Sequence, residues 1–205
     1  PPDEPEMPGF RGLLGVYASL LVSSFDNALV LPSMYSLIAS IASSAHEAHF
    51  AYGLSQTVYF VARTLGQLLA GRYLDAAGDH KTPFGTAMTT CLALGVVGSL
   101  LYTVAPWCGA RYGISVVLAA RGVLGLGSSS SVVSLSFVSR HVPKRRRTAL
   151  FAKLMGLQRS STPLAPVLVL ALDRLPKRGA LTAYNAPGQL LLLLLLLRSS
   201  NNDND

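Results

Sequence analysis

Long apolar runs dominate the sequence, separated by short connectors of glycine, proline and charged residues. The hydrocarbon core of a bilayer is about 30 Å thick, so a helix rising 1.5 Å per residue needs roughly 20 apolar residues to cross it. Five runs reach that length, and they cover residues 12–41, 50–74, 83–105, 113–138 and 148–172. A sixth run, residues 183–197, would reach only about 22 Å as a helix. The sequence therefore predicts an all-α, polytopic membrane helical bundle with five full spans and a truncated sixth.

The composition excludes several other classes of protein. Half of the residues are hydrophobic, 13% are charged and the mean hydropathy is +0.42, which is too apolar for most soluble domains. The net charge of +7 does not indicate nucleic-acid binding, because the basic residues lie in the gaps between apolar runs rather than on one solvated face. Two cysteines, Cys91 and Cys108, are too few for a disulfide framework or a metal site. We therefore expect no metal, no cofactor and no nucleic-acid partner.

Both ends of the chain differ from the apolar middle. The opening PPDEPEMPGF is acidic and proline-rich, unlike the basic start of a signal peptide, and a leucine block near the other end is followed by an Asn/Asp tail. We expect a cytoplasmic, disordered lead at residues 1–11, a six-helix unit at residues 12–197 and a polar tail at residues 198–205. We also expect the chain to be a fragment of a longer protein.

The basic residues between the runs predict the orientation in the membrane. With a cytoplasmic amino terminus, nine of them face the cytoplasm: Arg11, Arg72, Lys81, Arg140, Lys144, Arg145, Arg146, Arg147 and Arg198. Four face the other side: Arg111, Arg174, Lys177 and Arg178. The positive-inside rule therefore favours this orientation. The run at residues 144–147 fits an anchor near anionic headgroups better than a nuclear-localisation or nucleic-acid patch.

Several charged residues lie inside predicted spans, where each costs roughly 2.5–3.5 kcal/mol at the bilayer centre. Asp26 in the first span and Arg121 in the fourth both lie near mid-depth. A shared aqueous cavity would keep both charged, as in a proton relay or substrate pathway, although a structural ion pair or a kink cap at Pro32 explains them too. Arg159 lies among hydroxyls and prolines that suit an anion or helix packing, and Arg63 can reach the headgroups by snorkelling.

Small residues recur at helical spacing in the second and fourth runs. Gly125 and Ser129 are four residues apart on one face of the fourth run, and Gly66 and Ala70 are four apart in the second. Such pairs let a neighbouring backbone approach closely. We expect these positions to serve helix packing.

Three short motifs resemble those of major facilitator superfamily transporters. The stretch GRYLDAAGDHK resembles the loop between their second and third helices, RGVLGLGSS resembles their fourth-helix motif, and DNALVLPSM is similar to their first helix. The matching positions are Gly71, Asp75, Gly78 and Lys81 in the loop, Arg121, Gly125 and Gly127 in the fourth helix, and Asp26 and Pro32 in the first.

The resemblance implies a fold and a mechanism. Residues 12–197 would form the amino-terminal six-helix half of a transporter whose two halves rock about a central site, lined by the first and fourth helices. Asp26, Arg121 and Arg159 would line the substrate or ion pathway, Gly125 and Gly127 would serve helix packing, and the conformational gate would comprise Gly71, Arg72, Asp75, Gly78 and Lys81. The missing half, or a second copy, would be the partner within the lipid bilayer.

A narrower resemblance concerns GLQRSSTPLAPVL and LTAYNAPG, which are similar to the branch of SPX-domain vacuolar phosphate transporters and the lysosomal ceroid-lipofuscinosis membrane protein. This branch implies an endomembrane location, in a vacuole or lysosome. Two departures weaken the pattern: Asp79 and His80 stand where the family's loop is basic, which thins its charge network, and Ala165 replaces the glycine expected before Pro166.

The expected function is transport of a small solute by alternating access, and the arginines at 63, 121 and 159 favour an anion. A channel, or a non-transporting or truncated membrane protein, is the alternative. The enzyme alternative is an intramembrane serine protease prompted by Gly127 and Ser128, but such a protease needs a histidine beside the serine. His46, His49, His80 and His141 all lie in predicted connectors, so we expect no enzyme.

Overall fold

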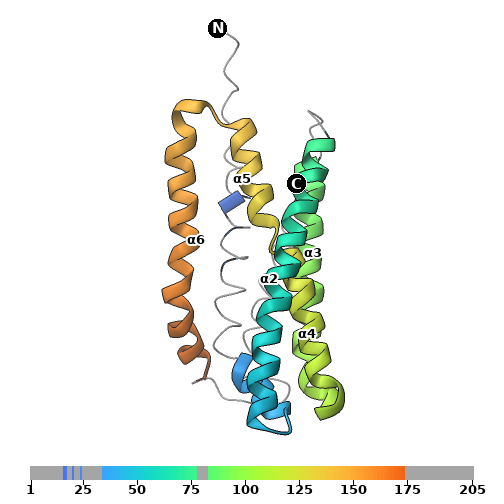
Figure 1. Ribbon diagram of the computed structural model, residues 1–205. Helices are drawn as coiled ribbons and strands as arrows, with labels where there is room; N and C mark the ends of the chain where they lie inside the picture. Colours follow the sequence, from blue (N-terminus) through green and yellow to red (C-terminus); the bar gives the residue numbers. More distant parts are fainter. Residues whose placement is uncertain (1–15, 18–19, 21–23, 25–33, 78–82, 174–205) are drawn as a thin grey trace, which may run out of the picture.

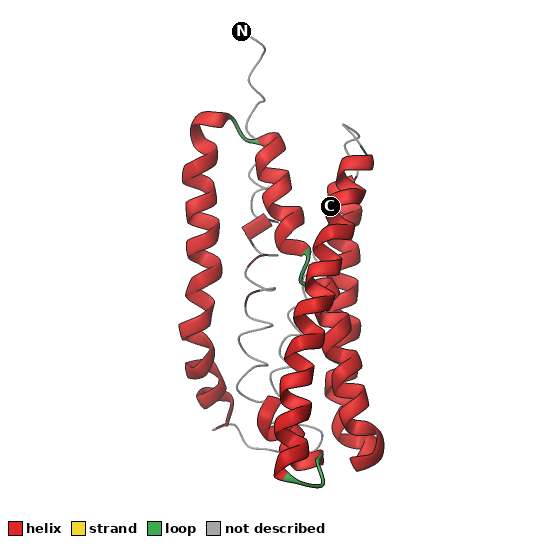
Figure 2. Cartoon of the chain, in the orientation of Figure 1, coloured by secondary structure: helices red, strands yellow, loops and turns green. Residues whose placement is uncertain are grey.

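The computed structural model describes residues 16–17, 20, 24, 34–77 and 83–173, and the side chains of residues 83, 110, 111 and 161–173 lie outside the description. Regular structure in this described part is entirely helical (Figure 2). The disordered lead (1–11), the sixth run (183–197), the polar tail (198–205) and the residues Asp26, Gly78 and Lys81 lie outside the described residues.

The helices follow one another with short connections. A helix at residues 34–41 precedes α2 (Ala45–Ala76), α3 (Pro83–Val104), the 3-10 helix η1 (Ala105–Cys108), α4 (Gly109–Gly127), α5 (Ser130–His141) and α6 (Lys144–Asp173). In Figure 1, α2, α3 and α4 stand together, α5 continues beyond α4, and α6 runs along the other side of α5. The predicted spans at residues 50–74, 83–105 and 148–172 correspond to α2, α3 and α6.

Helix α2 begins at an N-cap serine, Ser44. Ser44 accepts a hydrogen bond from the amide of Glu47 through its hydroxyl oxygen at 3.2 Å, and the Glu47 carboxylate accepts one from the amide of Ser43 at 2.8 Å. These contacts satisfy donors that a helix amino terminus otherwise leaves open. At 32 residues the helix is about 48 Å long, so it exceeds the thickness of a hydrocarbon core.

The fourth predicted span is a broken helix. Ser128 and Ser129 separate α4 from α5, and their hydroxyls donate to the carbonyls of Gly125 and Leu126, each at 2.7 Å. Hydroxyls that bond back to their own helix compete with the backbone ladder and bend it. The sequence analysis predicted a span at residues 113–138 without this break. Taken together, residues Tyr112–His141 remain long and apolar enough to cross a membrane.

The described part contains two segments that meet the length and hydropathy of a membrane span, Phe84–Cys108 and Tyr112–His141. Helix α2 carries polar side chains such as Gln56, Arg63 and Gln67 along its length, which dilute its hydropathy. Helix α6 is continuous from Lys144 to Asp173 and passes through Pro163 and Pro166 without ending. The five full spans of the sequence prediction thus stay a prediction.

The buried side chains form three clusters along the bundle. One cluster joins the helix at 34–41 to α2, α3, η1 and α4, and it contains Met34, Leu37, Ile38, Ile41, Ala48, Ala51, Tyr102, Ala105, Val117 and Ala120. A second joins α2, α3 and α5 through Leu74, Ala87, Cys91 and Val133. A third places Leu154 of α6 against Val138 and Val142 at the end of α5, with Val16 and Leu20. Arg121 lies on α4 between the first two clusters.

Candidate functional site

Arg121 is the most completely buried charged residue in the described part of the chain. Its side chain is 0% exposed, and it lies nine residues into the candidate span that starts at Tyr112, about 14 Å from that end. A cation at this depth requires polar or aromatic surroundings, because desolvation otherwise makes its charge costly.

Helix α2 supplies those surroundings from two positions one turn apart. Arg121 donates a hydrogen bond from Nη2 to Oε1 of Gln56 at 3.2 Å, and its guanidinium carbon lies 4.2 Å from the centroid of the Tyr59 ring. Tyr59 is itself buried, so the cation–π contact is shielded from water and correspondingly stronger. The sequence analysis missed both Gln56 and Tyr59, although their spacing on the second run places them on one helical face.

The two helices approach closely because glycines line α4. A Cβ atom built on Gly125 would lie 2.5 Å from the carbonyl oxygen of Tyr59, and one on Gly127 would lie 2.9 Å from the carbonyl oxygen of Cys91 on α3. Gly66 of α2 packs in the reverse direction, with a Cβ position 2.8 Å from the carbonyl oxygen of Leu126. Only a residue without a side chain fits at such distances. These glycines bring α2 and α3 against α4 within two turns after Arg121.

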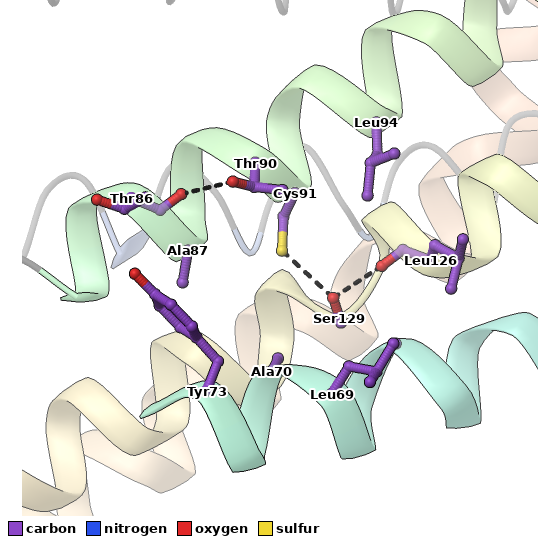
Figure 3. A pocket seen from close by; sticks show the side chains of 11 residues that line it. Leu69, Ala70, Tyr73, Thr86, Ala87, Thr90, Cys91, Leu94, Leu126 and Ser129 are labelled. Atoms are coloured by element: carbon purple, nitrogen blue, oxygen red, sulfur yellow. Dashed lines mark hydrogen bonds between the residues drawn. The ribbon is translucent and has the colours of Figure 1, made fainter. Parts of the chain in front are cut away.

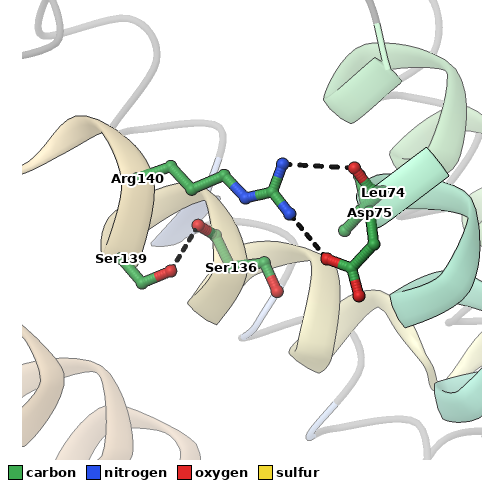
Figure 4. A network of polar contacts seen from close by, with 5 residues as sticks. All are labelled: Leu74, Asp75, Ser136, Ser139 and Arg140. Carbon is green, nitrogen blue, oxygen red and sulfur yellow. Dashed lines mark hydrogen bonds and ion pairs between the residues drawn. The ribbon is translucent and has the colours of Figure 1, made fainter. Parts of the chain in front are cut away.

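A second polar group lies at the carboxyl end of α2. Arg140 of α5 pairs with Asp75, with Nη2 2.8 Å from Oδ1, and donates from Nη1 to the carbonyl oxygen of Leu74 at 3.1 Å (Figure 4). The second bond satisfies a carbonyl at a helix end, where cations are also favoured by the helix dipole. The ring of Phe84 on α3 lies 5.8 Å from the Arg140 guanidinium. One arginine thus joins the ends of α2, α3 and α5.

Arg140 changes the interpretation of the predicted gate. From the sequence it was only one of nine orientation charges, and the gate network appeared thinned to Arg72, Lys81 and Asp75. In the structure Asp75 has a cationic partner 65 residues away in the chain. The sequence gave no spacing signal for this pair, because the partners lie on different helices.

The other predicted gate positions behave differently. A Cβ atom on Gly71 would meet nothing within 4 Å, so this gate glycine does not lie at a close helix contact, unlike Gly66. Arg72 is exposed at the end of α2. Gly78 and Lys81 lie outside the described residues.

The remaining predicted arginines do not join Arg121. Arg159 is exposed on α6 and makes no hydrogen bond or ion pair with the described residues. Arg63 is half-buried on α2, one turn beyond Tyr59. Asp26, the predicted partner of Arg121, lies outside the described residues. The described site is therefore built around Arg121 alone among the predicted pathway residues.

An apolar groove of about 400 Å³ opens between α2 and α3 beside the break between α4 and α5 (Figure 3). Its lining comprises Gly66, Leu69, Ala70, Tyr73, Thr86, Ala87, Thr90, Cys91, Leu94, Leu126 and Ser129. Ser129 donates its only hydroxyl proton to Leu126, so Cys91 is the donor in the 3.3 Å contact between its sulfur and the Ser129 oxygen. The polar atoms at the floor are thus satisfied internally, and the groove offers hydrocarbon surface rather than a site for a polar solute.

The described serines and histidines do not form a catalytic pair. Ser128, Ser129 and Ser131 each donate to the backbone carbonyl three residues earlier in the chain. His49 contacts the Tyr35 hydroxyl at 3.2 Å and His141 bonds to the carbonyl oxygen of Phe137 at 3.1 Å, at opposite ends of the bundle. No group of three or more His, Cys, Asp or Glu side chains in the described part could hold a metal ion.

Comparison with known proteins identifies the family. No curated protein and no solved structure gives a significant match to the chain. The family model described as Major Facilitator Superfamily matches residues 16–201, which is most of the 205-residue sequence. A helical bundle with a buried arginine between glycine-packed helices is consistent with a membrane carrier. The chain therefore belongs to the major facilitator superfamily, a family of integral membrane transport proteins.

Proposed function

We propose that the chain carries a small anionic solute across a membrane by alternating access, with Arg121 as the solute-binding cation. The burial of Arg121 at mid-depth carries this proposal. A guanidinium presents several N–H donors in a fixed plane that matches the oxygens of phosphate or carboxylate. The contacts from Gln56 and Tyr59 hold the plane of Arg121 in place from the α2 side.

Asp26 and Arg159 complete the proposed pathway. Asp26 would neutralise Arg121 when no solute is bound. When the anionic solute binds, it would replace Asp26 as the partner of Arg121. Arg159, exposed on α6, would face the pathway once a second six-helix half covers it. That second half, in a longer polypeptide or as a second copy of this chain, is the proposed protein partner.

The gate of the proposed carrier lies where Arg140 joins α5 to α2. Asp75 and Arg140 would hold one conformation closed, and Gly71, Arg72, Gly78 and Lys81 would provide the surrounding loop. The ion pair is partly solvated, since the Asp75 side chain is 79% exposed and that of Arg140 is 34% exposed. Such a pair is worth only about 0.2–1 kcal/mol, which lets it form and break during a transport cycle.

The finer topology is part of the same proposal. Five full spans and a sixth at residues 183–197 would place the amino terminus and the basic run at 144–147 in the cytoplasm. The family match extends through residues 183–197 and supports a sixth transmembrane element there. The SPX-domain and ceroid-lipofuscinosis branch, and with it a vacuolar or lysosomal membrane, is proposed from the motifs at residues 156–168 and 181–188.

Uptake of phosphate into proteoliposomes tests the function. We expect saturable uptake when the second half is present, in the longer polypeptide or as a second copy of the chain, and uptake reduced about tenfold or more in Arg121→Met because a charge-assisted hydrogen bond to the solute is lost. Replacing a buried charge by an apolar side chain of similar length often leaves stability unchanged, so Arg121→Met should still fold. The control is Lys153→Gln, which removes an exposed charge on α6 and should leave uptake unchanged.

Two results would contradict the proposal. Uptake that rises without saturation, with unchanged flux in Arg121→Met, would favour the channel alternative. A wild-type protein that contains the second half and is folded in the vesicles but moves no anion would favour the non-transporting alternative.

A further inference from the structure

The charges of the chain are distributed very unevenly. Between Asp79 and Asp173 the sequence contains no aspartate or glutamate at all. The same stretch contains ten lysines and arginines: Lys81, Arg111, Arg121, Arg140, Lys144, Arg145, Arg146, Arg147, Lys153 and Arg159. The basic residues of α4, α5 and the start of α6 therefore have no acidic neighbour within their own helices.

Four of these cations are consecutive and open helix α6. Lys144, Arg145, Arg146 and Arg147 form its first turn, which contains no acidic residue. The amino end of a helix carries a partial positive charge, so cations are disfavoured there and anions are favoured. Pro143 precedes the helix and has no side-chain acceptor to cap it; its carbonyl accepts from the amides of Arg146 and Arg147 at 3.0 and 3.2 Å. Within the described part of the chain, no acidic side chain lies in this first turn to supply a counter-charge.

Asp75, the described acid at the carboxyl end of α2, already has a partner. Asp75 pairs with Arg140, which precedes the cluster at the end of α5. Arg147 is directed back to the turn, where its Nη2 donates to the carbonyl oxygen of Val142 at 3.2 Å. Lys144, Arg145 and Arg146 are exposed. Successive residues point about 100° apart around a helix, so these three side chains point in different directions around its amino end. We call Lys144, Arg145 and Arg146 the collar.

The depth of this collar identifies the environment that it meets. The candidate span Tyr112–His141 ends three residues before Lys144. Residues immediately beyond a span lie at the level of the phospholipid headgroups. The collar thus combines cations at headgroup depth with a helix amino terminus at which the amides of Arg146 and Arg147 donate to Pro143.

We propose that Lys144, Arg145 and Arg146, with the amino terminus of α6, form a binding site for the phosphate of an anionic phospholipid in the cytoplasmic leaflet. Phosphate is the group that a helix amino terminus and guanidinium side chains both recognise. The bound headgroup supplies the counter-charge that the stretch from residue 80 to 172 lacks. This inference rests on the proposed cytoplasmic orientation of the 144–147 run, but not on transport.

The test is a binding titration of the purified chain in neutral detergent. The probe is short-chain phosphatidylserine, with short-chain phosphatidylcholine and inorganic phosphate as comparison ligands. We expect phosphatidylserine to bind more tightly than phosphatidylcholine, and the double variant Arg145→Gln/Arg146→Gln to bind it about 30-fold more weakly, from about 1 kcal/mol per basic residue. Each single variant should weaken binding about fivefold. The difference should shrink at high salt, because exposed charges are screened.

Two control variants isolate the charge at this end of α6. Lys153→Gln removes one exposed positive charge from the same helix and should bind like the wild type. Arg145→Lys/Arg146→Lys keeps the charges and should retain the preference for phosphatidylserine. Because the substituted residues are exposed and Arg147 is left in place, all the variants should show the same thermal unfolding as the wild type.

Three results would overturn the inference. Equal binding of phosphatidylserine and phosphatidylcholine would show that the collar does not select a negative headgroup. Unchanged affinity in the double glutamine variant would place binding elsewhere. Displacement of phosphatidylserine by inorganic phosphate at equal concentration would show a site for free phosphate rather than for lipid. None of these results depends on uptake, so the proposed transport function can fail or succeed separately.

Discussion

Two regions of the bundle use an arginine to connect helix α2 with the stretch formed by α4 and α5, and they do so in opposite ways. At the centre, Arg121 is fully buried against Gln56 and Tyr59, and the helix backbones touch at Gly125. At the end, Arg140 is 34% exposed and pairs with an Asp75 that is 79% exposed. The centre is fixed by backbone contact, whereas the end is held by a contact that water can replace. Motion of α2 against α5 therefore requires the least free energy at the end where Arg140 pairs with Asp75.

The largest expected effect comes from adding a side chain at the centre. In Gly125→Val the new Cβ atom would lie only 2.5 Å from the carbonyl oxygen of Tyr59. Neither backbone can move away without disturbing the contacts of Arg121. We expect the free energy of unfolding to fall by about 2–3 kcal/mol, as for other overpacked interfaces. Thermal unfolding of the purified variant in detergent measures this. Gly53→Ala is the control, because a Cβ there meets nothing within 4 Å; equal stability of the two variants would show that the helices are not in contact at Gly125.

Removing the aromatic ring above Arg121 should have the next largest effect. Tyr59→Leu keeps an apolar side chain but loses the cation–π contact, and for a desolvated pair this costs about 2 kcal/mol. Tyr59→Phe keeps the ring and is the matched comparison. A difference in unfolding free energy between Leu and Phe at this position measures the ring contribution. If the two variants unfold alike, the ring does not stabilise the buried guanidinium.

The sequence predicted the features of the centre that belong to a single helix. Arg121 follows from its depth in an apolar run, and the close packing expected at Gly66 and Gly125 follows from small residues at a spacing of four. The helical class of the described part and the family also follow from the sequence. The partners of Arg121 did not, because the register between two helices depends on which side chains interdigitate, and no pattern within either helix records it.

The features of the end were predicted less well, for a related reason. Asp75 stood out through its motif, but Arg140 is 65 residues away and looked like any orientation charge. The break at Ser128 and Ser129 was also missed, since a run of serines has no helix-breaking residue and bends the helix through hydroxyl bonds that need the folded geometry. Asp26, Gly78 and Lys81 stay predictions.

A smaller effect of opposite sign is expected at Gly71, near the end. Position 125 has room only for glycine, whereas position 71 faces open space. Gly71→Ala therefore adds no clash and raises helix propensity. We expect a gain of about 0.5–1 kcal/mol in unfolding free energy, measured by the same thermal assay. Gly66→Ala, on a different face of α2, should instead lower the free energy of unfolding, because its Cβ would lie 2.8 Å from the carbonyl oxygen of Leu126. A loss of stability at Gly71 would contradict the open position.

The smallest expected effect on stability is that of the ion pair between Asp75 and Arg140. Asp75→Asn, Arg140→Gln and the double variant form a cycle that isolates the pair from the bond that Arg140 also donates to Leu74. We expect a coupling free energy of about 0.2–1 kcal/mol that decreases with added salt. Uptake rates in the same variants would show whether this weak contact governs motion: if the pair holds one conformation closed, its removal changes the rate of transport more than it changes stability. A coupling free energy of several kcal/mol that is insensitive to salt would instead make the end as rigid as the centre, and the contrast between the two arginines would be lost.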